Sequence, residues 1–405
     1  MPDCNERFIK NTLNNLLLTE EVQAYISSKL NDDLTKILLG KSPFTGISSK
    51  EIAEQVDSKK RAEKKLPTWY NSSGIYYPPK LSIEQSSSEI TAKYKATLIK
   101  GNTIIDLTGG LGVDCHYFSK KAQSVTLCEL NPELSAIAQH NSEVLETTII
   151  HFIAGNGLEY LADSTENFDT IYIDPSRRVN AQKVFLLQDC EPDVVSNLDF
   201  LLSKAHRIII KTAPLLDIQS GIKELKQVSE IHVVSVKNEC KELLWIIDKD
   251  FSSAEPQIVC SALTENNIQE YRFQLSDEKV FTVVHYSNPL NYIYEPDVSL
   301  LKAGCFKLIS RDFAVLKLHQ HTHLYTSNNL VDFNGRTFRL KQLWSYKIFS
   351  KLKPIKQANL ICRNFPINAV EVKKKHRLSD GGDEYLLFTT NMTGELVVLN
   401  CERLS

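Results

Sequence analysis

The sequence has no long hydrophobic run and no leader-like start. Across its 405 residues, no uninterrupted apolar stretch approaches the ~18 residues that a membrane helix needs. The first seven residues, Met-Pro-Asp-Cys-Asn-Glu-Arg, lack the charged start and apolar centre of a signal peptide. We therefore expect a cytoplasmic protein without a membrane partner, built from two to four domains.

Cysteine and histidine patterns argue against disulfides and against a metal centre. The nine cysteines are scattered and include no Cys-x-x-Cys pair, which favours reduced thiols in a cytosol. His319, His321 and His323 alternate, so a strand would place them on one face, and three imidazoles can bind zinc. No cysteine or carboxylate lies beside them in the sequence, and we expect no metal.

A glycine-rich turn also lacks the last glycine of a dinucleotide-binding motif. Residues 104–112 read Ile-Ile-Asp-Leu-Thr-Gly-Gly-Leu-Gly, but the third motif position is Cys115. Asp106 precedes the turn, where it would repel a pyrophosphate and attract a cationic sulfonium. The pattern favours S-adenosylmethionine over a nicotinamide or flavin; the alternative is a glycine turn that serves only packing.

Polar residues follow each of the next short apolar segments. Glu129 directly follows the apolar segment 124–128. Its carboxylate suits a ribose diol, because it can accept hydrogen bonds from both hydroxyls. Asn156 follows residues 150–153 and could bond an adenine edge, and Asp174 follows residues 169–173. Segments of helical length separate these strands, which predicts a parallel, doubly wound α/β sheet with its ligand at the carboxyl ends. Residues 230–236 and 243–248 resemble a closing antiparallel hairpin.

These motifs, in this order, resemble the class I S-adenosylmethionine-dependent methyltransferases. The resemblance implies a Rossmann-like seven-stranded sheet over residues 104–248. It implies cofactor binding by Asp106, Thr108, Gly109, Gly110, Gly112, Glu129, Asn156 and Asp174. It also places Asp174, Pro175, Ser176 and Arg177 at the acceptor. Ser176 and Arg177 depart from the usual Pro-aromatic pair, so the methylated atom stays open.

From about residue 65 to its end, the chain is similar to a bacterial group of methyltransferases with a THUMP-like C-terminal domain. Residues 106–114, Asp-Leu-Thr-Gly-Gly-Leu-Gly-Val-Asp, together with residues 174–178, Asp-Pro-Ser-Arg-Arg, carry this match. The segments Arg363-Asn-Phe-Pro and Lys373-Lys-Lys-His-Arg-Leu-Ser-Asp-Gly-Gly-Asp strengthen it. We predict an N-terminal helical domain (1–65), the methyltransferase domain (66–250), a small α+β, ferredoxin-like domain (251–322) and a THUMP-like domain (323–405). Strand-like alternation is expected at residues 271–275 and 280–286. Ser86 and Glu89 have the spacing of a helix capping box.

Positive charge is concentrated near the C-terminus of a chain whose formal net charge is −2. Residues 334–377 hold twelve Lys or Arg against Glu371, roughly +11, which is typical of phosphate binding. Aromatic residues interleave with these charges and could stack on unpaired bases: Phe338, Trp344, Tyr346, Phe349 and Phe365. We expect structured RNA, tRNA or rRNA, as the partner. The expected RNA-binding residues are Arg363, Lys373, Lys374, Lys375 and Arg377. In the alternative interpretation, the lysines form a solvated face and the aromatics form a core.

Two other classes of function remain open. The protein could methylate a protein or small molecule, with a basic tail that serves only folding or solubility. It could also be a non-catalytic RNA-binding protein on a methyltransferase fold. Salt-dependent RNA binding separates the first from an RNA methyltransferase, and cofactor binding separates the second. The sequence does not set the oligomeric state.

Overall fold

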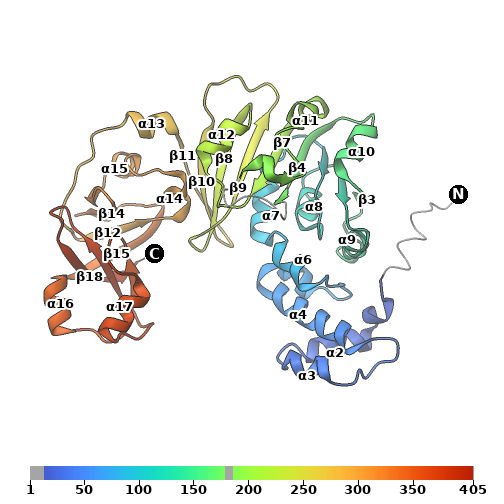
Figure 1. Cartoon of the computed structure of the whole chain (residues 1–405), viewed down its shortest axis with the longest axis horizontal. Helices are drawn as coiled ribbons and strands as arrows, with labels where there is room; N and C mark the ends of the chain where they lie inside the picture. The colour runs from blue at the N-terminus through green and yellow to red at the C-terminus, as the bar shows by residue number, and fades with distance from the viewer. Residues whose placement is uncertain (1–12, 178–185, 405) are drawn as a thin grey trace. The chain divides into compact units, whose positions relative to one another are not determined.

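The computed structural model describes residues 13–177 and 186–404 (Figure 1). The chain forms two compact units. Unit 1 comprises Met1–Ser229 with Leu244–Ser253, and unit 2 comprises Glu230–Leu243 with Ala254–Ser405. The domain boundaries expected near residues 65, 250 and 322 stay predictions.

Unit 1 begins with helices, as the apolar periodicity predicts. They are η1 (Asn15–Leu18), α2 (Glu20–Ser28), α3 (Leu34–Leu39), α4 (Ser49–Lys65), α5 (Pro67–Asn71), α6 (Lys80–Gln85) and α7 (Glu89–Lys95). Ser48 and Glu51 form a capping box at the start of α4. The capping box expected from Ser86 and Glu89 is wrong. Ser88 caps α7 by accepting the Thr91 N–H, and the Glu89 carboxylate instead accepts the Thr68 hydroxyl at 2.9 Å.

A largely parallel sheet follows these helices. Its order is β11-β10-β8-β9-β7-β4-β1-β2-β3. The strands are β1 (Thr103–Asp106), β2 (Ser124–Glu129), β3 (Ile150–Ala154), β4 (Phe168–Ile173), β7 (Ala205–Thr212), β8 (Val228–Val236), β9 (Glu239–Asp248), β10 (Gln257–Leu263) and β11 (Ile268–Gln274). Pairs β1–β2, β1–β4, β2–β3 and β4–β7 are parallel, so the carboxyl ends of these five strands share one edge.

Helices separate the parallel strands along the chain, and their buried residues give them an inner face. They are α8 (Val113–Phe118), α9 (Pro132–Val144), α10 (Gly157–Asp163), α11 (Leu198–Lys204) and α12 (Ile218–Glu224). Between α10 and α11 lie the two-residue strands β5 (Ser176–Arg177) and β6 (Cys190–Glu191), and η2 (Leu187–Asp189). The expected α/β architecture is confirmed, and β10 and β11 extend the seven predicted strands to nine.

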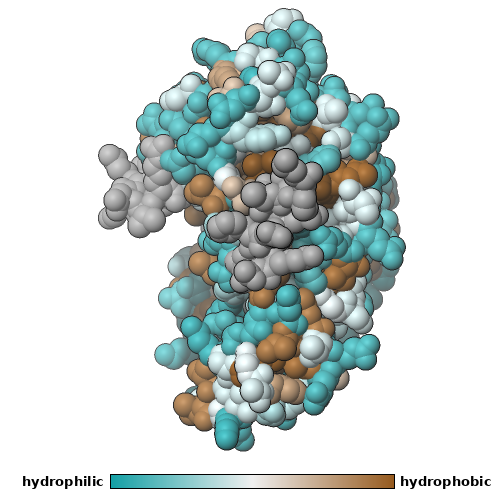
Figure 2. All heavy atoms as spheres, turned by 90° about the vertical axis from the view of Figure 1, so that its right-hand side faces the viewer, coloured by the Kyte–Doolittle hydropathy of each residue, from teal (hydrophilic) through white to brown (hydrophobic). Residues whose placement is uncertain are grey.

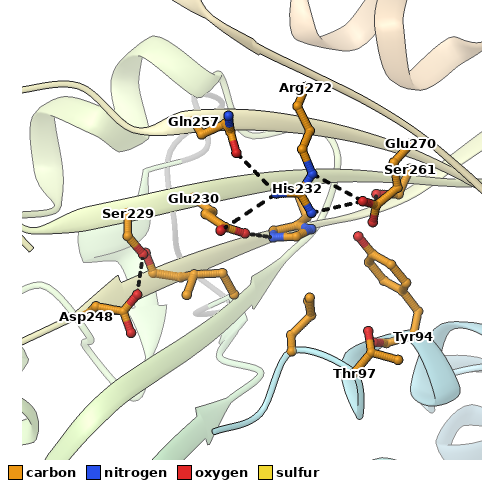
Figure 3. A network of polar contacts seen from close by, with 12 residues as sticks. Tyr94, Thr97, Ser229, Glu230, His232, Asp248, Gln257, Ser261, Glu270 and Arg272 are labelled. Carbon is orange, nitrogen blue, oxygen red and sulfur yellow. Dashed lines mark hydrogen bonds and ion pairs between the residues drawn. The ribbon is translucent and has the colours of Figure 1, made fainter. Parts of the chain in front are cut away.

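The predicted hairpin is β8–β9. Lys237 and Asn238 connect the strands with φ of 52° and 60°. Two successive positive φ values define the type I′ turn that two-residue hairpins favour. In unit 2, polar side chains tie β8, β10 and β11 together (Figure 3). Arg272 of β11 donates to Gln257 of β10 at 3.1 Å and lies 3.8 Å from Glu230 of β8. Buried His232 lies 2.7 Å from Glu230 on the same strand.

The remainder of unit 2 is a seven-stranded sheet with order β13-β14-β12-β15-β18-β17-β16. Its strands are β12 (Tyr292–Pro296), β13 (Leu316–His319), β14 (Thr322–Ser327), β15 (Gly335–Ser345), β16 (Asn359–Cys362), β17 (Glu384–Thr390) and β18 (Leu396–Arg403). Its helices are α13 (Leu275–Val280), α14 (Val298–Ala303), α15 (Leu308–Asp312), α16 (Tyr346–Leu352) and α17 (Ala369–His376). Strands from both sides of residue 322 therefore share one sheet.

The strand expected at residues 280–286 is wrong. Residues 281–285 have no regular structure, and Tyr286 makes only an isolated bridge with Lys317. Val280 and Val283 are 78% and 59% exposed, so the alternation of side chains buries no apolar face there. A period-two pattern predicts a strand only when one of its faces is covered.

Candidate active site

The carboxyl ends of the parallel strands in unit 1 border a cavity of about 580 Å³. Its wall includes residues 107–111 after β1, Glu129 after β2, residues 155–158 after β3, Asp174 after β4 and Lys211 near the end of β7. This volume lies in the usual range of small-molecule sites, roughly 300–1,000 Å³.

Figure 2 shows one face of the molecule, where hydrophilic side chains predominate and hydrophobic ones form patches between them.

The glycine turn packs closely on β2 and presents backbone to the cavity. A Cβ on Gly109 would come within 2.2 Å of the Leu127 side chain, so only glycine permits this approach. Gly110 and Gly112 have φ of 55° and 77°, a left-handed conformation that glycine adopts without steric cost. Gly112 is also the N-cap of α8.

Glu129 is held in place by two backbone amides. Its Oε2 accepts the Gly110 N–H at 2.8 Å, and its Oε1 accepts the Asn131 N–H at 2.8 Å. A carboxylate has about four acceptor positions, so each oxygen can take a further hydrogen bond. This geometry suits a vicinal diol.

Asp106 lies beneath the turn and does not line the cavity. Its carboxylate accepts the Thr108 N–H at 2.8 Å, the Thr108 hydroxyl at 3.1 Å and the Cys115 thiol at 3.4 Å. Burial raises its pKa to about 7. The Thr108 hydroxyl in turn accepts the Asp174 N–H at 2.7 Å. Asp106 thus connects the glycine turn to the loop after β4, and its direct contact with a cofactor stays a prediction.

Asn156 lines the cavity and also starts a helix. Its Oδ1 accepts the Leu158 N–H at 2.9 Å, which caps α10, and its Nδ2 donates to Glu159 at 3.2 Å. After β4, Pro175 is buried and Ser176 is exposed. The backbone of Arg177 pairs with Cys190, but its side chain lies outside the described part of the chain.

Lys211 lies beside Asp174 in the wall of the cavity. Its Nζ donates to Asp174 Oδ2 at 2.6 Å, and both residues line the wall. Desolvation raises the pKa of Asp174, while the positive charge and hydrogen bond of Lys211 oppose that rise. In the sequence, the only signal for Lys211 is its place near the end of an aliphatic strand.

A buried ion pair supports the same wall. The fully buried Lys95 lies 2.8 Å from Asp114 Oδ1, and its Nζ also contacts the Ser87 hydroxyl at 2.5 Å and the Tyr172 hydroxyl at 3.3 Å. Ser87, Asp114 and Tyr172 line the cavity, whereas Lys95 lies behind them. Sequence reasoning missed this cluster because its members come from four separate segments.

In unit 2, the predicted RNA-binding residues differ in their surroundings. Lys374, Lys375 and Arg377 are exposed, and Lys373 pairs with Asp380. Arg363 binds the fully buried Glu295 at 2.8 Å. Further ion pairs join Arg336 to Glu295, Arg339 to Glu402 and Lys341 to Glu384.

Five of the twelve cations in residues 334–377 therefore pair with acids, and all those acids lie outside this window. The formal charge of roughly +11 overstates the free charge. Phe338, Trp344 and Phe349 are buried, so the expectation that they stack on bases is wrong and they belong to the core.

Exposed cations remain on two neighbouring helices. The Tyr346 hydroxyl of α16 lies 3.1 Å from His376 Nε2 of α17, and Lys375 Nζ lies 5.3 Å from the centre of the Tyr346 ring. Burial lowers the pKa of His376, and the positive charges of Lys375 and Lys353 lower it further. We call the exposed cations on and just after these helices the α16–α17 cations: Lys347, Lys351, Lys353, Lys374, Lys375 and Arg377.

Two absences apply to residues 13–177 and 186–404 only. No helix in these ranges combines the length and apolarity needed to cross a membrane. No group of three or more His, Cys, Asp or Glu side chains there is arranged to hold a metal ion.

The chain is similar to a solved structure, to two domain families and to several curated proteins. A crystal structure from Porphyromonas gingivalis W83, assigned as a methyltransferase, is 32% identical, with a TM-score of 0.86. The match covers 97% of this chain and 99% of that one. A ferredoxin-like domain family matches residues 292–333, and a THUMP-like domain family matches residues 335–403.

Curated relatives match shorter segments. An uncharacterised S-adenosylmethionine-dependent methyltransferase of Mycobacterium tuberculosis (strain CDC 1551 / Oshkosh) is 22% identical over 172 residues, or 40% of this chain and 44% of the relative. An uncharacterised RNA methyltransferase of Mycoplasma mobile is 33% identical over 75 residues, or 18% and 21% of the two chains. The chain thus spans less than half the length of these curated relatives.

Proposed function

The chain belongs to the methyltransferase family of the Porphyromonas gingivalis W83 structure, and from this membership we propose that it methylates a base in structured RNA with S-adenosylmethionine as methyl donor. The single observation that carries the proposal is the cavity at the carboxyl ends of β1, β2, β3 and β4. There the glycine turn, the fixed Glu129 carboxylate, Asn156 and Asp174 meet in one wall.

The cavity wall fits the parts of this cofactor. Glu129 would accept the two ribose hydroxyls, because its amide contacts already fix its orientation. Asn156 would contact the adenine, and the backbone of residues 108–110 would hold the methionine portion. Asp106 would act through Thr108, whose position it fixes.

When bound, S-adenosylmethionine supplies an electrophilic methyl group on a positively charged sulfur. The protein would contribute position and electrostatics rather than covalent catalysis. Asp174 would face the acceptor, together with the backbone of Pro175 and Ser176. Arg177 would lie beside a phosphate or a base edge.

Docking of RNA is proposed for unit 2. The α16–α17 cations, the THUMP-like match at residues 335–403 and the RNA methyltransferase relative support this partner. Phosphate contacts by exposed lysines would give an affinity that falls as salt rises. We also propose a cytoplasmic location; the eight described cysteines are free rather than disulfide-bonded.

One observation favours a second candidate, methylation of a protein or small molecule. Five cations of residues 334–377 pair with acids and three of the aromatics are buried, as expected if much of this region serves folding.

The test has two stages, each with its own variant. Calorimetry with S-adenosylmethionine should show binding to wild type and to Asp174→Ala, because Asp174 serves transfer. Methyl transfer from labelled cofactor to bulk tRNA and rRNA should then be lost in Asp174→Ala. Absence of cofactor binding by wild type would contradict the enzyme proposal, and transfer only to protein or small-molecule fractions would establish the second candidate.

A further inference from the structure

Asp174 and Lys211 place a carboxylate and an ammonium side by side at the acceptor end of the cavity. Asp174 follows β4, and Lys211 lies near the end of the neighbouring parallel strand β7, since Ile173 of β4 pairs with Ile210 of β7. Their side chains are 27% and 19% exposed, and Nζ lies 2.6 Å from Oδ2. The Thr108 hydroxyl accepts the Asp174 N–H at 2.7 Å and so fixes the backbone of that residue.

A second ion pair on β7 shows what a structural contact looks like in this sheet. Arg207 near the start of the strand binds Asp248 through Nε and Nη2, each at 2.8 Å, and donates to the Leu98 carbonyl at 2.7 Å. That guanidinium is 9% exposed and does not line the cavity. Lys211, by contrast, lines the cavity and donates to Asp174 alone among the described residues, although its ammonium group has three donors.

We propose, building on the proposed function, that Asp174 and Lys211 together bind the lactam edge of the acceptor base, an N–H beside a C=O. This edge occurs at N1 and O6 of guanine and at N3 and O4 of uracil. The carboxylate accepts the N–H, and the ammonium donates to the carbonyl oxygen. The methylated atom is then the ring nitrogen.

The charges favour this acceptor over an exocyclic amine. A neutral amine becomes positively charged as it is methylated, which a neighbouring ammonium opposes. A lactam reacts after loss of its proton, and the resulting negative charge spreads to the carbonyl oxygen. An ammonium group beside that oxygen stabilises it, most strongly where water is excluded.

The step balances without another reagent. Asp174 takes the ring N–H proton, and the electron pair of that bond stays on the lactam. The ring nitrogen then bonds to the methyl carbon while the methyl–sulfur bond breaks and its pair remains on sulfur. The N-methyl lactam is neutral, and Asp174 releases its proton to solvent.

The position of the methyl group is the first test. Full-length protein is incubated with bulk tRNA and rRNA and labelled S-adenosylmethionine, and the RNA is digested to nucleosides for mass spectrometry. Label on a ring nitrogen of guanosine or uridine is expected. Label on the amino group of adenosine or cytidine overturns the lactam inference and leaves the RNA methyltransferase proposal standing. Cofactor binding without label in any RNA overturns both.

The second test concerns Lys211 as a positioning and charge-stabilising residue. Lys211→Met should lower kcat at neutral pH by about 10²–10³-fold, the usual cost of losing one oxyanion donor. Cofactor affinity and the thermal midpoint should stay near wild type. Part of the loss should return at alkaline pH, where the lactam ionises without help, and Lys211→Arg should retain more activity than Lys211→Met.

Lys223→Met provides a matched control, because Lys223 is exposed on α12 and does not line the cavity. A Lys211→Met variant with the same reduced kcat at every pH would show that the ion pair only supports the fold. Full activity of this variant at neutral pH would also overturn the inference.

Discussion

The Glu129 carboxylate accepts the Gly110 N–H across 2.8 Å, and this bond fixes the end of β2 to the turn after β1. The group proposed to bind the ribose therefore also orders the backbone proposed to bind the methionine. Two parts of one ligand site depend on a single side chain, so its removal should affect cofactor binding more than a surface substitution does.

Glu129→Ala should weaken S-adenosylmethionine binding by about 1.5–3 kcal/mol, the usual range for hydrogen bonds to a charged group. This corresponds to roughly a 10- to 150-fold increase in Kd. Calorimetry measures it, with Glu143→Ala on the exposed side of α9 as the control. Equal affinities of Glu129→Ala and wild type would remove Glu129 from the site.

Asp106 should make stability depend on pH. Its pKa is raised to about 7, so the folded protein holds a proton that the unfolded chain releases near pH 4. The stabilisation is fully present below about pH 4 and is lost as the pH rises towards 7. Asp106→Asn cannot titrate, so its unfolding free energy should fall less over this range. Parallel urea titrations would reject the assignment if both proteins show the same slope between pH 4 and 7.

Lys95→Met should destabilise unit 1 by about 3–5 kcal/mol, because it leaves the Asp114 carboxylate without its buried partner. Lys121→Met is the matched control, since Lys121 is exposed on the surface of the same unit. Thermal unfolding measures both. Adding Asp114→Asn to Lys95→Met should recover part of the loss, whereas an unchanged midpoint in the single variant would contradict the buried pair.

Gly157→Ala should disturb the backbone at Leu107, where the glycine turn begins. Its Cβ would lie 2.7 Å from the Leu107 carbonyl oxygen, so either α10 or the turn must shift. A Cβ on Gly155 meets no atom within 4 Å, which makes Gly155→Ala the control for stability. Differential scanning calorimetry should show a lower midpoint only for Gly157→Ala. Equal midpoints would mean that the turn adapts without cost.

The α16–α17 cations should dominate RNA binding. Changing Lys351, Lys353 and Lys375 to alanine should lower affinity for bulk tRNA. It should also reduce the slope of log K against log salt by about one for each phosphate that the variant no longer binds. Replacing Lys373, Lys374 and Lys375 together should lower the RNA affinity less than replacing three unpaired lysines does. The reason is that Lys373 already pairs with Asp380.

The control for the RNA experiment is Arg339→Ala with Lys341→Ala, since both cations pair with acids. Filter binding at several salt concentrations measures all variants. A slope that is the same in the lysine variant and in wild type would place the RNA elsewhere or exclude it.

Sequence reasoning succeeded where neighbours in space are set by topology. The carboxyl ends of parallel strands meet at one edge, so Glu129, Asn156 and Asp174 could be brought to one cavity from their positions after apolar segments. It failed where partners come from separate segments. Lys95 gives no local signal for Asp114, and the acids that neutralise the basic window, such as Glu295, lie outside it.

β12, the third strand of the seven-stranded sheet, makes two segments of unit 2 depend on each other. β12 lies between β14 and β15, and its residues Tyr292–Pro296 pair with Gly335–Arg339. The ferredoxin-like segment supplies the block β13-β14-β12 of this sheet, and the THUMP-like segment supplies the adjoining block β15-β18-β17-β16. Cutting the chain near residue 334 would leave an unpaired edge strand on each piece, β12 on one and β15 on the other. Unpaired edge strands promote aggregation. We therefore expect the two segments to fold only as one piece.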